Sequence, residues 1–311
     1  MVARGFSLIA LWAVLALGTL VLGLVTSWLD RKVTARVQAR IGPPWYQPVA
    51  DILKLLGKET LVPEGAGRAV FLTAPILGIA GMTLAAALLG RAIISPEAGF
   101  IGDVVVLVYL LIIPALAMIL GASAAGNPFS SVGASREMKL ILGYELPYLI
   151  VVVMVIMKAG FDFRMGAIIG SQVQNGWNLW SASGILGFIV LLMSAQAKLG
   201  LVPFDIPEAD QELMGGVITE YSGAPLALIR ITKTLLMAVM PLFIVVLLMG
   251  GIRMTVTGVV WGLVKYLAVV VLIVLVRNTN PRVRIDQALR FFWGPVTLLA
   301  AIGFICALGG W

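Results

Sequence analysis

The 311-residue sequence contains no histidine and a single cysteine, Cys306. These absences remove the usual ligands of zinc, haem and cysteine-bound iron–sulfur clusters, so we expect the chain to bind no redox cofactor or metal by itself. One thiol cannot form an internal disulfide. Charge is also scarce, because 12% of the residues are charged whereas about 25% are charged in soluble domains. This composition excludes a soluble enzyme.

Apolar residues are abundant, at 60% of the chain and a mean hydropathy of +1.05, which excludes a disordered protein. Each long apolar run is close to the length that a helix needs to cross the hydrocarbon of a membrane. Because lipid cannot satisfy an open backbone, these runs should be helices. The sequence predicts an all-α membrane protein, a single domain over 1–311, with about eight transmembrane helices at 6–28, 69–90, 103–122, 138–158, 182–198, 223–249, 256–277 and 292–311.

The loop charges predict the orientation of these spans. Most loop lysines and arginines fall in the first, third, fifth and seventh loops, and the opposite side holds only Arg4, Arg91, Lys158, Arg164 and Arg253. Basic loops usually face the cytoplasm, so we expect the odd-numbered loops inside and both termini outside. The net charge of +7 therefore fits a multi-pass membrane protein better than a nucleic-acid binder.

The first loop, residues 29–68, is too long to be a simple connector. Its bases follow at helical spacing, a Gly42-Pro43-Pro44 turn comes next, and a second short helix is expected over 47–57. We interpret the loop as a docking platform for a soluble subunit, through Arg31, Lys32, Arg36, Arg40, Asp51, Lys54 and Lys58. The alternative is a basic surface helix that contacts lipid headgroups.

The fourth span carries an acid, Glu145, about 10 Å inside the membrane at 1.5 Å per residue. A carboxylate at that depth costs several kcal/mol unless it is paired or protonated, which favours a proton or ion route. Arg230 and Lys233 in the sixth span lie at a comparable depth and are the expected counter-charges, and Arg136 stands at the entry of the fourth span. A static buried ion pair is the alternative.

The fifth loop, residues 199–222, is acidic. Glu208 and Glu212 are four residues apart and would share one face of a helix there, a repulsive pair unless a cation, a proton or a partner intervenes. Crowded carboxyls titrate as a group and can pass protons, whereas the alternative is a solvated acidic face. The candidate relay residues in this loop are Asp205, Glu208, Asp210, Glu212 and Glu220.

Six segments, in this order along nearly the whole chain, resemble one known family: DRKVTARVQARIGP, QPVADILKLLGKE, GYELP, VPFDIPEADQEL, TEYSG and RNTNPRVRIDQALR. They are similar to the membrane subunit shared by respiratory complex I, where it is NADH dehydrogenase subunit 1 or NuoH, and by group 4 energy-converting membrane-bound NiFe hydrogenases. The resemblance implies eight spans and an acidic channel on Glu145 and the five loop acids, with Arg136 nearby.

One segment departs from the quinone-reducing members, because the stretch GPPWYQP is shorter than theirs and resembles the hydrogenase-type branch. This branch implies a non-redox subunit in a prokaryotic cell membrane that links electron transfer to proton or sodium translocation, with protons or sulfur compounds as acceptor. The implied partners are an iron–sulfur small-subunit-like protein, a NiFe hydrogenase large-subunit-like protein and antiporter-like membrane subunits. A quinone-reducing subunit, a stand-alone ion carrier and a passive anchor are the alternatives.

Overall fold

The computed structural model describes the backbone of residues 2–310 and the side chains of residues 9–310, apart from those at positions 98 and 210. Within this range the chain forms α-helices, short 3₁₀ helices and one π-helical segment, and no strand. The predicted all-α fold is confirmed.

Seven helical segments of the described chain are long and apolar enough to cross a membrane. They are α1 (Val2–Val37), α3 (Arg68–Ile94), α4 (Asp103–Leu110) with α5 (Ile113–Ala124), α6 (Pro128–Lys158), α10 (Gly223–Leu248), α11 (Val256–Thr279) and α12 (Ile285–Phe291) with α13 (Thr297–Leu308). The shorter apolar helix α8 (Ala182–Lys198) makes the eighth, as the sequence predicts.

Local chemistry places some helix ends differently from the hydropathy pattern. Helix α6 begins at Pro128 instead of residue 138, because the Asn127 side chain accepts a hydrogen bond of 2.8 Å from the Phe129 N–H and proline suits the first turn. The third span is interrupted between α4 and α5 just before Pro114, which has no N–H to donate to the preceding turn. A π-helical turn, η4 (Phe292–Val296), containing Pro295, joins α12 to α13.

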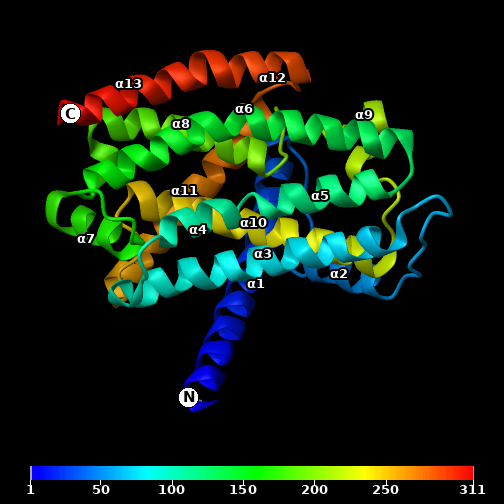
Figure 1. Ribbon diagram of the computed structural model, residues 1–311, viewed down its shortest axis with the longest axis horizontal. Helices are drawn as coiled ribbons and strands as arrows, with labels where there is room; N and C mark the ends of the chain where they lie inside the picture. The colour runs from blue at the N-terminus through cyan, green and yellow to red at the C-terminus, as the bar shows by residue number, and fades with distance from the viewer. Residues whose placement is uncertain (1, 311) are drawn as a thin grey trace.

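The polar connections gather at the two ends of the bundle. Figure 1 shows α2 (Gln47–Leu56) and α9 (Asp210–Leu213) at one end and α7 (Met165–Asn175) at the other. The 3₁₀ helix η3 (Gly216–Ile218) follows α9, while η1 (Pro96–Ala98) packs against α7 and η2 (Asn178–Trp180) follows it. We refer to these as the α2 end and the α7 end.

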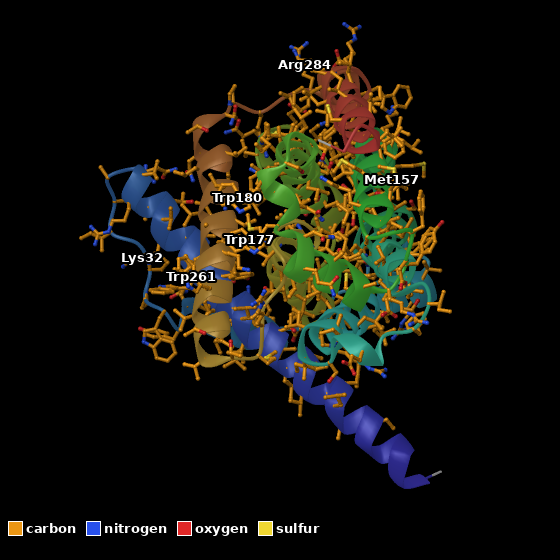
Figure 2. All side chains as sticks on the ribbon, turned by 90° about the vertical axis from the view of Figure 1, so that its left-hand side faces the viewer. Lys32, Met157, Trp177, Trp180, Trp261 and Arg284 are labelled. Atoms are coloured by element: carbon orange, nitrogen blue, oxygen red, sulfur yellow. The ribbon has the colours of Figure 1, made fainter. Side chains whose placement is uncertain are left out.

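Tryptophan side chains mark the α7 end. Trp177, Trp180 and Trp261 lie on the face turned toward the viewer in Figure 2, and the rings of Trp177 and Trp180 stack with their centroids 6.0 Å apart. Trp180 and Trp261 are exposed. Because tryptophan is enriched where a membrane meets water, these residues fit an interfacial position for this end.

Helix α10 forms the centre of the bundle, and α1 crosses it. Residues 235–248 of α10 are buried except at position 237, and the helix packs against α1, α2, α3, α8 and α11. Helix α1 runs steeply across the other helices, and its first half extends beyond them (Figure 1). The start of α10 therefore lies between two groups of neighbours, and residues on its two sides face two different cavities.

Candidate functional site

A narrow cavity lies at the α2 end, between α3, α5, α6, α10 and the loop of residues 199–222. About 50 Å³ of it is open to water, which is room for a few molecules. Most of its wall is apolar, yet five acidic or basic side chains line it. We call it the charged cavity, after Glu137, Lys198, Asp205, Glu208 and Lys233.

The acidic loop reaches this cavity because α6 has no side chain where the loop crosses it. A Cβ on Gly133 would lie 2.8 Å from the Val217 nitrogen and 3.0 Å from the Pro207 carbonyl oxygen, so only glycine permits this approach. Behind the crossing, the Tyr221 hydroxyl donates to the Phe71 carbonyl at 3.0 Å. Burial raises the pKa of Tyr221 to about 12, so its hydroxyl stays neutral in the cavity wall.

Glu145 forms an ion pair with Lys198 at the end of α8, with 2.8 Å between Oε2 and Nζ. The Lys198 side chain is 1% exposed and that of Glu145 is 15% exposed. The lysine nitrogen also lies 4.4 Å from the ring centroid of Tyr148 and 4.9 Å from that of Tyr144. The other Glu145 oxygen is buried without a hydrogen bond in the described structure. The half-buried Glu145 is therefore paired with one lysine, whose ammonium group lies over two aromatic rings.

The predicted counter-charges of Glu145 are wrong. Lys233 is paired with Glu208 across the charged cavity, and the exposed Arg230 faces a different cavity. Helical spacing predicts a depth for these two bases, but it does not tell which neighbour each one faces. The partner that the sequence analysis left out, Lys198, comes from a helix that ends at the level of Glu145.

The loop acids do not form one cluster. Asp205 is paired with Arg282, and Glu212 with Arg136 at 2.7 Å between Nη1 and Oε2. The Arg136 hydrogen bond and charge lower the pKa of the exposed Glu212, which is therefore an anion at neutral pH.

Glu208 and Glu212 do not share a helix face, so that prediction is wrong: α9 begins only at Asp210, two residues after Glu208. Glu208 lines the charged cavity, whereas Glu212 is exposed. The Glu220 carboxylate accepts from the Asn127 side-chain amide, so it supports the residue that caps α6. The predicted relay residue Asp210 has its side chain outside the described residues.

Two residues of the charged cavity, Glu137 and Lys198, were absent from the predicted set. Glu137 lies beside Arg136 in α6, and no base lies within 4 Å of its carboxylate among the described residues. The positive charges of Lys233 and Lys198, which line the same cavity, act on it. The signal for Glu137 was its spacing, because it precedes Glu145 by two helical turns and so shares its side of α6.

The predicted docking residues fall into two groups. Arg36 and Arg40 are exposed, and the Lys32 ammonium donates to the Gly42 carbonyl at 3.4 Å. The others, Arg31, Asp51, Lys54 and Lys58, line a second cavity between α1, α2 and α10.

No group of three or more histidine, cysteine or acidic side chains among the described residues is arranged to hold a metal ion.

The ion pair between Arg31 and Asp51 ties α2 to α1, with 2.6 Å between Nη1 and Oδ2. Burial alone would raise the pKa of Asp51, but the hydrogen bonds from Arg31 and from Gln47, the latter at 2.8 Å, outweigh burial and lower it. Asp51 therefore remains an anion at neutral pH, and this end of α2 stays attached to α1.

Residues 9–308 match the family model described as NADH dehydrogenase. The chain belongs to the NADH dehydrogenase subunit 1 (NuoH) family. Curated relatives in this family include the H subunits of the NADH-quinone oxidoreductases of Bacillus thuringiensis (strain Al Hakam) and Bacillus anthracis (strain A0248). Each is 33% identical over 290 residues, which cover 88% of this chain and 85% of the relative.

A solved structure, described as the membrane-bound sulfane sulfur reductase, an archaeal respiratory membrane complex, contains a chain of the same fold. Its TM-score is 0.88 at 29% identity, and the match covers 97% of this chain and 99% of that chain. The resemblance seen in the six sequence segments is confirmed. As a member of the NuoH family, the chain is a membrane subunit of a multi-subunit, complex I-like oxidoreductase.

Proposed function

We propose that this subunit couples electron transfer in docked soluble proteins to the movement of protons or sodium ions, and that it carries no redox centre itself. The observation that supports this proposal most is the charged cavity. It brings ionisable groups of the acidic loop, α6, α8 and α10 together, and one of its lining residues, Lys198, is the ion-pair partner of Glu145 in the fourth span. Keeping such charges away from bulk water is costly, which favours a role in ion movement.

The proposed relay has three steps. A redox event in a partner displaces the loop that carries Glu208, which weakens its ion pair with Lys233. The freed Lys233 charge then favours the anionic form of Glu137, which releases its proton into the charged cavity. The changed charge of Glu137 alters the balance between Lys198 and Glu145, from which the signal passes to antiporter-like partner subunits.

Exposed and half-buried charges at the α2 end form the proposed docking surface. It consists of Lys32, Arg36 and Arg40 near the end of α1, and of Arg136, Glu212, Arg282 and Arg284, which line a cavity of about 280 Å³ beside α9 and α12. Lys32 and Arg284 lie on different sides of the molecule in Figure 2, so a partner that contacts both would cover this end broadly. We place the α2 end in the cytoplasm, as the basic loops suggest.

The partners proposed for this surface are an iron–sulfur small-subunit-like protein and a NiFe-type large-subunit-like protein. Two observations favour the hydrogenase-type branch, with protons or sulfur compounds as acceptor. They are the short GPPWYQP stretch, residues 42–48, which leads into α2, and the close match to a chain of the sulfane sulfur reductase complex. The relatives from NADH-quinone oxidoreductases favour a quinone acceptor as the second candidate.

Replacing Glu145 by Gln tests the coupling role, because glutamine keeps the size of the side chain and removes its charge. In the purified complex reconstituted in vesicles, we expect Glu145→Gln to abolish gradient-linked activity while electron transfer to an artificial dye persists. The matched control is Glu97→Gln, at an exposed acid of η1 near the α7 end, which should leave both activities unchanged. Coupled activity that survives Glu145→Gln would show that the relay does not run through this residue.

A further inference from the structure

A second cavity, of about 500 Å³, lies between the end of α1, helix α2 and the start of α10. Five basic side chains and one acid, Asp51, line it. We call it the basic cavity, after Arg31, Lys54, Lys58, Arg230 and Lys233. The relay proposed above uses only Lys233 of this set.

The positive charge of the basic cavity is only partly balanced by the protein. Asp51 is paired with Arg31, and Lys233 with Glu208 of the neighbouring charged cavity. In the part of the chain that the structure describes, no carboxylate lies within 4 Å of the cationic nitrogens of Lys54, Lys58 or Arg230. Lys54 also acts on Asp51 through its charge, but none of these three cations has an ion-pair partner among the described residues. This excess of positive charge in one cavity indicates an anionic ligand.

The depth of Arg230 indicates where that anion comes from. Arg230 follows the first residue of α10, Gly223, by seven positions, which is about 10 Å along the helix at 1.5 Å per residue. It is exposed at the surface of the protein, and a charge at this depth is costly unless an anion accompanies it. The ligand therefore has to reach the boundary between lipid headgroups and hydrocarbon.

Much of the remaining wall of the basic cavity is apolar, beside the hydroxyl groups of Ser27 and Thr234. Ile52 and Leu55 of α2 and Leu226 and Met237 of α10 lie beside the bases, and Leu53 and Leu56 expose the outer side of α2. An inorganic ion makes no apolar contact with such a wall, whereas the acyl chain of a lipid packs against it. The combination of three free cations and an aliphatic wall fits a phospholipid whose headgroup is held under α2.

We propose that the basic cavity binds the phosphate group of an anionic phospholipid, with Lys54, Lys58 and Arg230 as its ligands and Leu226 and Met237 against its acyl chain. The guanidinium of Arg230 donates two parallel hydrogen bonds to phosphate oxygens, and the ammonium groups add charge. Because Lys233 lines both cavities, the bound lipid lies next to the ion pair of Lys233 and Glu208. The lipid is thus a structural neighbour of the proposed relay.

The test is binding of spin-labelled phosphatidylglycerol to the purified, delipidated complex in a neutral detergent, read as the immobilised fraction of the label. We expect the double variant Lys54→Gln/Arg230→Gln to weaken this binding at least tenfold, because a hydrogen bond to a charged group is typically worth a factor of about ten or more. The matched control Lys139→Gln removes an exposed base of α6 outside the basic cavity and should bind like the parent. Spin-labelled phosphatidylcholine, which has no net charge, should show little difference between the three proteins.

Two competition arms identify the ligand. Inorganic phosphate at millimolar concentration should leave the phosphatidylglycerol signal unchanged, and its displacement of the lipid would show a free-anion site instead. A short-chain quinone should also fail to compete, and competition would assign the cavity to a quinone. Unaltered phosphatidylglycerol binding in a double variant that keeps the thermal midpoint of the parent complex would overturn the proposal.

Discussion

Removing Lys198 should be among the most damaging single changes in this chain, because it leaves the largely covered carboxylate of Glu145 without its partner. The 2.8 Å distance between Nζ and Oε2 corresponds to a Coulomb attraction of about 6 kcal/mol at an effective dielectric constant of about 20. Most of this attraction offsets the cost of taking both charges out of water. The net effect of breaking such a pair from one side is a loss of about 3–5 kcal/mol.

The variant Lys198→Met keeps the length of the side chain and removes its charge and its contacts with Tyr144 and Tyr148. A loss of this size should lower the thermal midpoint of the purified complex by roughly 6–10 °C, at about 2 °C per kcal/mol for a chain of this size. Lys139→Met, at an exposed base of α6, is the matched control and should shift the midpoint little.

Adding Glu145→Gln to Lys198→Met separates stability from function. With both charges gone, no unpaired charge remains buried, so most of the lost thermal stability should return. Gradient-linked activity should stay absent, since the relay then lacks both groups. If Lys198→Met is as stable as Lys139→Met, the ion pair contributes nothing to stability and the expectation is refuted. Coupled activity in the double variant would refute the role of the two groups in the relay.

Two further predictions concern the α2 end. Gly133→Ala should destabilise the packing of the acidic loop on α6 by about 1–3 kcal/mol and reduce coupled activity. The control is Gly170→Ala, where a Cβ meets nothing within 4 Å, and it should change neither property. Equal thermal midpoints of the two variants would disprove the close approach of the loop to Gly133. Because Asp51 has a lowered pKa in the fold, its tie to α1 is fully present above its ordinary pKa of about 4 and is lost as the pH falls through the lowered value. A nitroxide label at position 53 should therefore become more mobile in acid, and in Asp51→Asn its mobility should be the same at all pH values. A label whose mobility changes neither with pH nor with this substitution would contradict the role of the ion pair between Asp51 and Arg31.

Hydropathy and loop chemistry predict most of the helices, since length and apolar composition decide whether a segment can span a membrane. The short helix after the Gly42-Pro43-Pro44 turn, predicted over 47–57, is confirmed as α2. The start of α6 was misplaced by ten residues, because a polar first turn reads as a loop by hydropathy although Asn127 and Pro128 carry the capping signal. The capping signal was therefore present in the sequence, but the hydropathy pattern decided the predicted start of the helix.

The charge pairs were not predictable in the same way. Glu145 and Lys198 are 53 residues apart, and only the packing of α8 against α6 brings them together. Arg230 and Lys233 lie one turn apart on α10, yet Lys233 faces both cavities while Arg230 faces only the basic one. A sequence shows how deep a charge lies in its helix, but its partner depends on how the helices are rotated against each other.

In the proposed relay, a redox change in the docked partners alters the protonation of a carboxyl group in the charged cavity. Redox-induced infrared difference spectroscopy of the whole complex measures this directly, because a protonated carboxyl has an absorption of its own. We expect a carboxyl signal on reduction that is lost in Glu137→Gln and retained in Glu97→Gln. A complex that shows no such signal, or one whose signal persists in Glu137→Gln, would contradict the proposed relay.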